Sequence, residues 1–291
     1  MNKKALVGLA TLNESENILE LISELDNLDE KLDILVVDGN STDGTIESVK
    51  NLFREKSGKY LIIQKENMGL ASAHLCMYKF AIENHYDLLI TLDADFSHDP
   101  KEINRFIQIA ESDEEIALVI GSRYMKNGKT DNRGYRLLVS KFANKFASLV
   151  IGGNLNEYTT SFRLFHLKYL SQIDSGSLDS KGYSFFFRMM FEFLRKQFLV
   201  IEIPIHFHER KRGKSKIPKL EIFKSFAELT LIHFKRKETS TLLGDVLPAC
   251  QGCESSLTIG INPRSQHAVG IDERKKDSYL IFCTICGSIN N

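Results

Sequence analysis

The chain has no net charge, no long apolar run and no internal repeat. Its 38 Lys and Arg residues balance 38 Asp and Glu residues, so the whole-chain charge does not indicate a nucleic-acid or membrane partner. No segment reaches the ~18 consecutive apolar residues that a membrane-spanning helix needs. The composition, with 43% hydrophobic and 26% charged residues, is otherwise that of an ordinary globular protein with a sizeable core.

The N-terminal segment lacks the features of a secretory signal. Two lysines precede an apolar stretch from Ala5 to Leu12, but the polar pair Asn13-Glu14 ends it and no small-residue cleavage site follows. We therefore expect a first β-strand in this segment. The expected location is the cytoplasm, with neither a signal peptide nor a transmembrane helix.

Cysteine is scarce, and four of the five cysteines lie close to the C-terminus. Cys250 and Cys253 form one CxxC pair, and Cys283 and Cys286 form a second one roughly thirty residues later. Two such pairs are typical of a tetrahedral zinc site with four thiolate ligands. Disulfides are the alternative, which a cytoplasmic location disfavours. We expect a small zinc-ribbon-like unit over residues 246–291, which could bind a protein partner.

Short aliphatic runs alternate with segments of helical periodicity in the first ~120 residues. The runs are 5–10, 32–38, 60–64, 88–93 and 116–121. The segments between them open on capping or turn residues such as Ser15 and Ser41. Alternation of this kind with continuous apolar strands predicts an α/β fold, with helices covering both faces of a mostly parallel sheet.

The rest of the chain continues with the same kinds of element. Further strands are predicted at 159–166 and 199–207, helices at 136–150, 182–196 and 219–234, and a polar loop at 124–133. Residues 238–245 have the composition of a linker. The predicted organisation is therefore a domain at 1–237, this linker, and the C-terminal unit at 246–291.

Acidic side chains follow several of the predicted strands. Glu14 follows the first run, Asp38 ends the second, Asp93 ends the fourth, and Asp95 follows two positions later. Ligands of parallel α/β sheets bind beyond the carboxyl ends of the strands, so these acids should border one crevice. Two carboxylates one residue apart can hold Mg²⁺ or Mn²⁺. Strand-end solvation or helix capping explains one such pair alone, but not polar segments after four successive strands.

Five segments together resemble the family 2 glycosyltransferases of the GT-A fold. They are DADFSHDP, GSRY, TTSFRLF, KGYSFFF and EIPIHFHERKRGKSK. The resemblance runs from about Leu6 to about Lys237 and points to the polyprenyl-phosphate sugar transferases, such as the dolichyl-phosphate mannose synthases. It implies a Rossmann-like GT-A domain that moves a hexose from a nucleotide sugar to a polyprenyl phosphate. Mannose from GDP-mannose is the first expectation and glucose from UDP-glucose the second.

The resemblance also implies roles for individual residues. The nucleotide sugar would be held by Glu14, Asp38, Gly69 and Asp93. The catalytic Mg²⁺ or Mn²⁺ would be bound by Asp93, Asp95 and Ser97. The acceptor phosphate would be bound by Arg123, Arg136, Lys214 and Lys216. The catalytic residues would be Asp95, Arg123 and Arg163.

The chemistry expected of such a site needs no strong base. A lipid phosphate is already ionised at neutral pH, so the positive side chains mainly offset repulsion between two anionic substrates. A metal ion would offset charge on the departing diphosphate. Direct in-line attack would invert the configuration of the anomeric carbon.

The chain departs from the family pattern at several positions. Glu157 stands where an aspartate is usual, and Thr160 where a glycine is usual. Phe186 and Arg188 replace a Gln or Glu that faces the sugar, and Glu192 could compensate from the next helical turn.

Two alternative functions stay open. One is transfer to a saccharide hydroxyl, which needs a carboxylate base such as Glu157 or Glu192. The other is a catalytically silent scaffold that recruits partners through the zinc ribbon.

A basic segment precedes the last predicted helix. Residues 209–219 contain six cations and one acid, and the amphipathic segment 219–234 follows. A solvated loop followed by a core-packed helix is one interpretation. The other is peripheral contact with the anionic cytoplasmic membrane surface, to which each cation near the lipid contributes about 1 kcal/mol.

Overall fold

The computed structural model describes residues 3–28, 32–54, 56–65, 67–174, 178 and 184–212, together with four two-residue strands nearer the C-terminus. Several predicted features lie outside these residues: the helix at 219–234, the linker at 238–245, Lys214, Lys216 and the four cysteines of the CxxC pairs. No helix in the part of the chain that the structure describes is long and apolar enough to cross a membrane.

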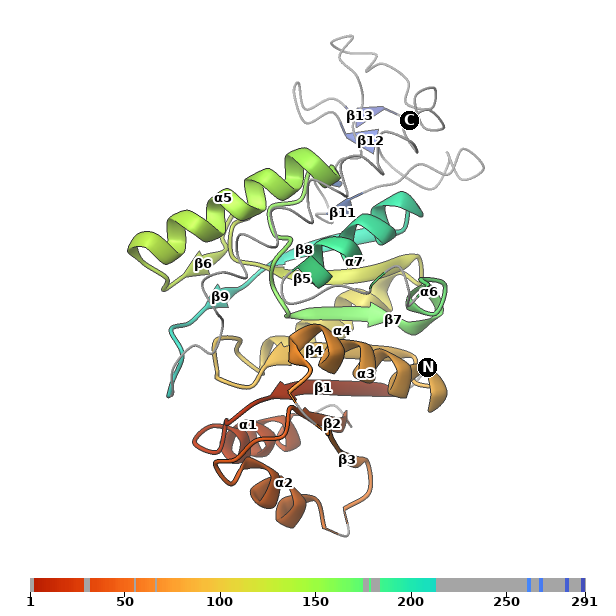
Figure 1. Ribbon diagram of the computed structural model, residues 1–291. Coiled ribbons are helices and arrows are strands. Elements are labelled where there is room, and N and C mark those ends of the chain that lie inside the picture. The colour runs from red at the N-terminus through yellow and green to blue at the C-terminus, as the bar shows by residue number, and fades with distance from the viewer. Residues whose placement is uncertain are drawn as a thin grey trace.

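A mixed β-sheet runs through the described chain in the strand order β10-β11-β8-β5-β7-β4-β1-β2-β3 (Figure 1). The central strands are β1 (Ala5–Thr11), β2 (Leu32–Asp38), β3 (Lys59–Ile63), β4 (Leu88–Asp93), β5 (Ile116–Ser122), β7 (Arg163–His166) and β8 (Leu199–Pro204). At the β8 edge lie β11 (His267–Ala268) and β10 (Ile261–Asn262), and β12 (Ile281–Phe282) pairs separately with β13 (Ile289–Asn290). The strands β1, β2, β3 and β4 are parallel, as are β5 and β8, and β7 is antiparallel to both of its neighbours. The predicted mostly parallel sheet is confirmed.

Helices cover both faces of the sheet. One face packs against α1 (Ile18–Asp26), α2 (Thr45–Phe53) and α4 (Glu102–Ser112). The other packs against α3 (Gly69–Glu83), α5 (Gly134–Ile151), α6 (Leu167–Leu170) and α7 (Ser184–Arg195). Successive strand residues such as Leu6 and Val7 belong to opposite cores, because strand side chains alternate between the faces. This double burial explains the continuous apolar runs in the sequence.

The predicted strand at 199–207 is divided into two. It consists of β8 and a two-residue strand β9 (His206–Phe207), which pairs with β6 (Lys129–Thr130) rather than with the main sheet. The division falls after Pro204, which has no N–H to donate. The pairing of β6 with β9 fixes the polar loop after β5 against the end of β8.

The strand predicted at 159–166 begins later than expected. It is β7, which starts at Arg163. Ahead of it, the carbonyls of Tyr158 and Thr160 accept hydrogen bonds from the Arg163 guanidinium, at 2.8 and 2.9 Å. A side chain thus takes up carbonyls that a longer strand would offer to its neighbours.

Candidate active site

The turns after β1 and β2 meet at the carboxyl edge of the sheet. Asp38 is fully buried, and its carboxylate accepts hydrogen bonds from Thr11 Oγ1 at 2.7 Å and from the Ser41 backbone N–H and hydroxyl at 2.7 and 2.8 Å. The backbone N–H of Asn13 donates to Ser41 Oγ, which joins the two turns. Asp38 therefore holds the two turns together, and neither of its carboxylate oxygens is exposed. This geometry does not support the predicted direct contact between Asp38 and a nucleotide.

Asp93 and Asp95 lie at the end of β4, as predicted. The Asp93 side chain is partly exposed, and one of its oxygens accepts a hydrogen bond from Ser161 Oγ at 2.6 Å. Asp95 is buried and accepts the N–H of Ser97 at 3.0 Å. Phe96, between Asp95 and Ser97, has a backbone φ of 62°, which is uncommon for a residue other than glycine. The two carboxylates are therefore held in a tight turn at the strand end.

Arg210 connects two of the predicted site acids. Its guanidinium lies 2.8 Å from Asp95 Oδ2 and 3.3 Å from Glu14 Oε1. The segment that carries it is fixed to the Asp95 turn, because His208 N donates to the Ser97 carbonyl and Lys211 N to the Asp95 carbonyl. Glu14 and Asp95, from different strand ends, are thereby brought together. Arg210 belongs to the basic segment at 209–219, whose composition predicts no specific role for a single arginine.

The imidazole of His98 holds the backbone of Asp93 in place. It is buried, and its Nδ1 accepts the backbone N–H of Asp93 at 3.2 Å. Burial lowers the pKa of His98, so the ring is neutral. Its proton is therefore on Nε2, which donates to Thr160 Oγ1 at 3.3 Å. Thr160, which replaces a usual glycine, has an ordinary φ and uses its hydroxyl in this contact.

Arg123 is held rigidly by Glu157. The guanidinium Nε lies 2.7 Å from Glu157 Oε2, Nη2 donates to Glu157 Oε1 at 3.3 Å and to Thr159 Oγ1 at 2.9 Å, and the Phe207 ring packs against it at 4.6 Å. Glu157 is fully buried. Burial raises the pKa of its carboxyl, but the Arg123 charge and the hydrogen bonds from Arg123 and Thr159 hold it below its ordinary value. Although Glu157 stands where an aspartate is usual, both of its carboxylate oxygens therefore contact the Arg123 guanidinium.

A second buried acid supports this pair. Glu202 on β8 accepts hydrogen bonds from the backbone N–H groups of Asn156 and Glu157 and from the Asn156 amide, at 2.8 to 3.0 Å. Burial raises the pKa of Glu202 to about 7, although the Asn156 hydrogen bonds oppose the shift. Glu202 fixes the turn that carries Glu157, and so it positions Arg123 indirectly.

Arg163 does not reach the crevice. It is fully buried, packs over the Phe186 ring at 4.8 Å and donates to two backbone carbonyls. Burial lowers the pKa of Arg163 to about 10, so the side chain remains charged at neutral pH. The predicted catalytic role of Arg163 is not supported, because the guanidinium is enclosed by protein. The sequence pattern could not distinguish this inward position from an outward one.

The helix α7 carries Phe186, which departs from the family pattern, and Glu192, which was predicted to compensate for it. Phe186 is part of the apolar core, where its ring meets His74 edge-on at 5.1 Å. Glu192 pairs with Arg195 on the same helix, at 2.6 Å. Glu192 is thus committed to a neighbour on α7, and this contact gives no support to its predicted substitution for a sugar-facing acid.

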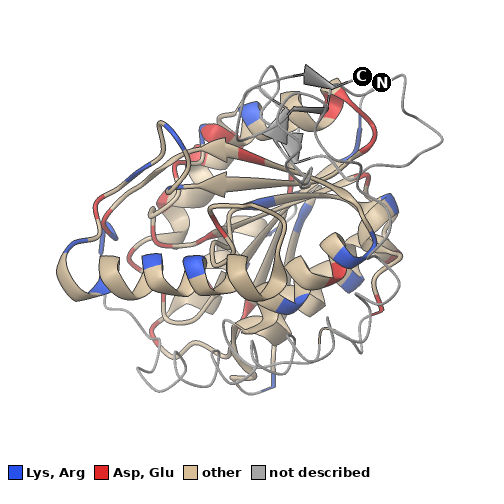
Figure 2. Cartoon of the chain, turned by 90° about the horizontal axis from the view of Figure 1, so that it is seen from above, with Lys and Arg blue, Asp and Glu red and all other residues tan. Residues whose placement is uncertain are grey.

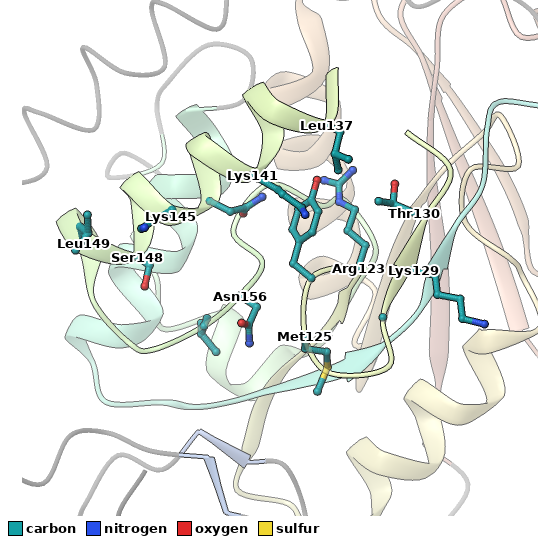
Figure 3. A pocket seen from close by; sticks show the side chains of 14 residues that line it. Arg123, Met125, Lys129, Thr130, Leu137, Lys141, Lys145, Ser148, Leu149 and Asn156 are labelled. Atoms are coloured by element: carbon teal, nitrogen blue, oxygen red, sulfur yellow. The ribbon is translucent and has the colours of Figure 1, made fainter. Parts of the chain in front are cut away.

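A pocket of about 680 Å³ lies between α5 and the loop after β5 (Figure 3). Its positively charged lining includes Arg123, Lys141 and Lys145, and Leu137 and Leu149 supply apolar surface. The α5 sequence contains basic residues but no acid. The long helix at the front of Figure 2 accordingly has blue positions and no red ones. Arg136, predicted to bind phosphate, is on the same helix but does not line the pocket. The pocket thus combines positive charge with apolar surface.

Gly128 keeps the pocket loop close to β5. A Cβ atom at this position would lie 2.6 Å from the Ser122 carbonyl oxygen and 2.8 Å from the Arg123 carbonyl carbon. These are backbone atoms, so we expect Gly128→Ala to displace the loop and to destabilise the fold by about 1–3 kcal/mol. Chemical denaturation measures this change. Lys126→Ala, on an exposed position of the same loop, is the control and should unfold like the native chain.

Comparisons with known proteins agree with this architecture. Residues 7–174 match the family described as Glycosyl transferase family 2. A polyprenol monophosphomannose synthase of Mycolicibacterium smegmatis is 32% identical over 74% of this chain and 81% of its own length. An undecaprenyl-phosphate mannosyltransferase of Micrococcus luteus is 31% identical over 74% of this chain and 87% of its own.

Solved structures show the same fold at lower identity. The crystal structure of glucosyl-3-phosphoglycerate synthase from Mycobacterium tuberculosis, in complex with Mn²⁺, UDP and glucosyl-3-phosphoglycerate, superposes with a TM-score of 0.58. The match covers 79% of this chain and 80% of that one, at 17% identity. The family match covers more than half of the chain, and the relatives named above are alike over most of its length. The chain therefore belongs to glycosyl transferase family 2 and is a glycosyltransferase of the GT-A fold.

Proposed function

We propose that the enzyme transfers a hexose from a nucleotide sugar to a polyprenyl phosphate with inversion at the anomeric carbon. The observation that carries this proposal is the pocket beside Arg123, which combines fixed positive charge with apolar surface. A lipid phosphate has the same two properties. The names of the relatives favour mannose, so we propose GDP-mannose as donor and UDP-glucose as the next candidate.

The donor site proposed here is the turn at the end of β4. Asp93, Asp95 and Ser97 fit a hard divalent cation, since Mg²⁺ and Mn²⁺ take carboxylate and hydroxyl oxygens together with substrate phosphates. Such an ion would offset charge on the departing diphosphate. Arg210 adds a positive charge beside Asp95 and Glu14. Gly69 opens α3 with a φ of 83°, and we retain it as a proposed nucleotide contact.

The acceptor site proposed here is the pocket itself. Arg123 cannot swing away while Glu157 and Thr159 hold it, so its positive charge is in place before any substrate binds. Lys141 and Lys145 would add charge along the same wall, while Leu137 and Leu149 would contact the prenyl chain. Arg136, Lys214 and Lys216 remain proposed as further phosphate ligands.

The geometry argues against a saccharide hydroxyl as acceptor. That reaction needs a carboxylate able to take a proton from the hydroxyl. Glu157 is fully buried in its pair with Arg123, and Glu192 pairs with Arg195. Neither of these candidate bases is positioned for the reaction. A silent scaffold is also disfavoured, because Asp93 and Asp95 both stand at the strand end.

Charge reversal on the pocket wall tests the acceptor site. In Lys141→Glu/Lys145→Glu, we expect kcat/KM for polyprenyl phosphate to fall about 10- to 100-fold, since contacts to a charged group are worth about 1.5–3 kcal/mol. The KM for the nucleotide sugar should stay within about twofold. Lys50→Glu, on the opposite side of the sheet, is the matched control and should behave like the native enzyme. A double variant with an unchanged kcat/KM for polyprenyl phosphate would remove the pocket from the proposal.

We also propose that the enzyme docks peripherally on an anionic membrane surface. Besides the basic segment at 209–219, α5 exposes Tyr135, Leu138, Phe142 and Leu149 by 61–70%. Large apolar side chains next to lysines are typical of a helix that lies in a membrane interface.

Vesicle binding tests this docking. Leu138→Glu/Phe142→Glu should lose most co-sedimentation with anionic vesicles at low salt, because two charges replace two apolar contacts with the lipid. Leu19→Glu alters an exposed leucine on α1 and should sediment with the vesicles like the native chain. Equal sedimentation of all three proteins would exclude a role for α5.

The C-terminal cysteines keep their proposed role. Cys250, Cys253, Cys283 and Cys286 would bind a structural zinc ion, and the unit they form could bind a protein partner. Elemental analysis of zinc, together with titration of thiols in the folded chain, tests this assignment.

A further inference from the structure

Two histidines and an aspartate converge beside the pocket loop, away from the acids of the donor site. The short strands β6 and β9 are paired (Figure 1). His206 and His208 lie on either side of Phe207 at β9, and Asp131 follows β6. Because strand side chains alternate, both imidazoles leave the chain on the side opposite Phe207. The Phe207 ring packs on Arg123 and His98, so the histidines are on the outer side of β9.

The three side chains have the spacing of metal ligands. Potential ligand atoms of Asp131, His206 and His208 all lie within 4.8 Å of one another. Asp131 Oδ1 lies 2.7 Å from His206 Nε2, and Asp131 Oδ2 lies 3.6 Å from His208 Nδ1. Ligands bound about 2.1 Å from one metal ion lie roughly 3.0–3.4 Å apart. Small side-chain rotations would therefore bring all three onto one ion.

An ordinary ion pair explains only part of this arrangement. The two imidazole rings lie 4.0 Å apart and share one carboxylate. An ion pair needs one cation and one anion, whereas here nitrogens of two imidazoles face the two oxygens of one carboxylate. This is the ligand set of a mixed nitrogen and oxygen metal site.

The carboxylate is oriented as a ligand should be. Asp131 Oδ2 accepts the backbone N–H of Glu209 at 3.2 Å, and Asp131 N donates to the Phe207 carbonyl at 2.9 Å. Ligand side chains held by such backbone contacts bind metals more tightly. About two-fifths of the Asp131 and His206 side chains is exposed, which leaves room for water ligands.

We propose that Asp131, His206 and His208 form a binding site for Zn²⁺ or a similar nitrogen-preferring dication. It is separate from the Mg²⁺ or Mn²⁺ site proposed at Asp93 and Asp95, which offers oxygen ligands only. Two imidazoles favour zinc over magnesium, because Mg²⁺ prefers carboxylate and water oxygens.

The bound ion would tie the pocket loop to the donor site. Asp131 belongs to the loop at 124–133, which lines the pocket, whereas His208 N is hydrogen-bonded to the Ser97 carbonyl at 2.9 Å. A metal ion at this place would therefore fix the pocket wall relative to the Asp95 turn. No other group of three potential ligands with this spacing occurs among the described residues.

Counting zinc in the full-length chain tests the site. The protein is equilibrated with micromolar Zn²⁺ and millimolar Mg²⁺, and bound zinc is measured before and after treatment with an organic mercurial. Mercurials displace zinc from thiolates and spare imidazole ligands, so zinc on the cysteine pairs is counted separately. We expect about one mercurial-resistant zinc per native chain, because three protein ligands suffice for a zinc site completed by water.

Variants decide the assignment. Asp131→Asn and His206→Ala should lose the resistant zinc while retaining the native circular dichroism spectrum, and His208→Gln is a milder third variant. His85→Ala alters an exposed histidine elsewhere and should keep the zinc. Absence of resistant zinc in the native chain, or its retention by Asp131→Asn, His206→Ala and His208→Gln alike, would overturn the proposal.

Discussion

Replacing Asp95 with asparagine is expected to reduce sugar transfer about 10²–10³-fold, the usual cost of losing one electrostatic contact to the transition state. The substitution keeps the size of the side chain and its ability to accept the Ser97 N–H, so the turn should stay folded. It removes the charge that would hold a divalent cation and that now pairs with Arg210. Initial rates with a labelled nucleotide sugar measure the loss.

The neighbouring Asp99 provides the control for this substitution. Its carboxylate accepts the Lys101 N–H at 3.0 Å in a turn just ahead of α4, and an asparagine side chain forms such a turn as well as aspartate does. Asp99→Asn should therefore transfer sugar within about twofold of the native rate. An Asp95→Asn enzyme with a third or more of the native activity, and with the same metal requirement, would remove Asp95 from the proposed chemistry.

Replacing Arg123 with methionine is expected to impair both stability and activity. Its partner Glu157 is fully buried, and breaking a buried ion pair from one side costs about 3–5 kcal/mol. Loss of the charge at the pocket should also reduce transfer about 10²–10³-fold. Denaturant unfolding and initial-rate kinetics measure the two effects separately.

A double variant separates structure from catalysis. Arg123→Met/Glu157→Leu has no unpaired buried charge, so it should regain most of the lost stability. It should not regain transfer, because the positive charge is still missing. Recovery of both properties would make Arg123 a purely structural residue.

The stability of Arg123→Met should also depend on pH in a defined direction. Without Arg123, burial of Glu157 is opposed by the Thr159 hydrogen bonds and the charge of Arg163, which is hydrogen-bonded elsewhere, so the pKa of Glu157 in the folded variant should lie above that in the unfolded chain. A raised pKa means that the folded state binds a proton more tightly than the unfolded state. The free energy of unfolding of Arg123→Met should therefore approach that of the native enzyme as the pH falls through this raised pKa.

The architecture was predictable because burial on two faces leaves a clear signature. The runs at 5–10, 32–38, 88–93 and 116–121 correspond to β1, β2, β4 and β5, and continuous apolar strands of this type are typical of covered parallel sheets. The antiparallel direction of β7 was not predicted. A short strand such as Arg163–His166 has the same apolar pattern in either direction, so direction depends on the connections and not on the strand.

The sequence predicted the positions of the site residues along the strands, but for some of them not the direction of the side chain. Asp93, Asp95 and Arg123 were placed near their structural positions, because they directly follow strand ends. Asp38 and Arg163 also border strands, yet their side chains turn inward onto Ser41 and onto backbone carbonyls. Linear spacing defines the position of a residue along a strand, but local hydrogen bonds decide which way its side chain points.

The residues that were missed act across long distances in sequence. Arg210 meets Glu14 across 196 positions, and Glu202 anchors Asn156 across 46. His98 was visible in the DADFSHDP segment, but its contact with Thr160 depends on how β4 and β7 pair. Such contacts follow from the folded topology, and a single sequence contains no periodic signal for them.

Transfer of the sugar to a lipid phosphate can be tested in a single assay. Labelled GDP-mannose and UDP-glucose are offered with polyprenyl phosphate or unphosphorylated polyprenol, in Mg²⁺ or Mn²⁺ and in chelator, and label is counted in the organic extract. We predict label only with the phosphate acceptor and a metal ion, in a product whose anomeric configuration is inverted. Equal label with unphosphorylated polyprenol, no label in the organic extract, or a lipid product with retained configuration would contradict the proposed reaction.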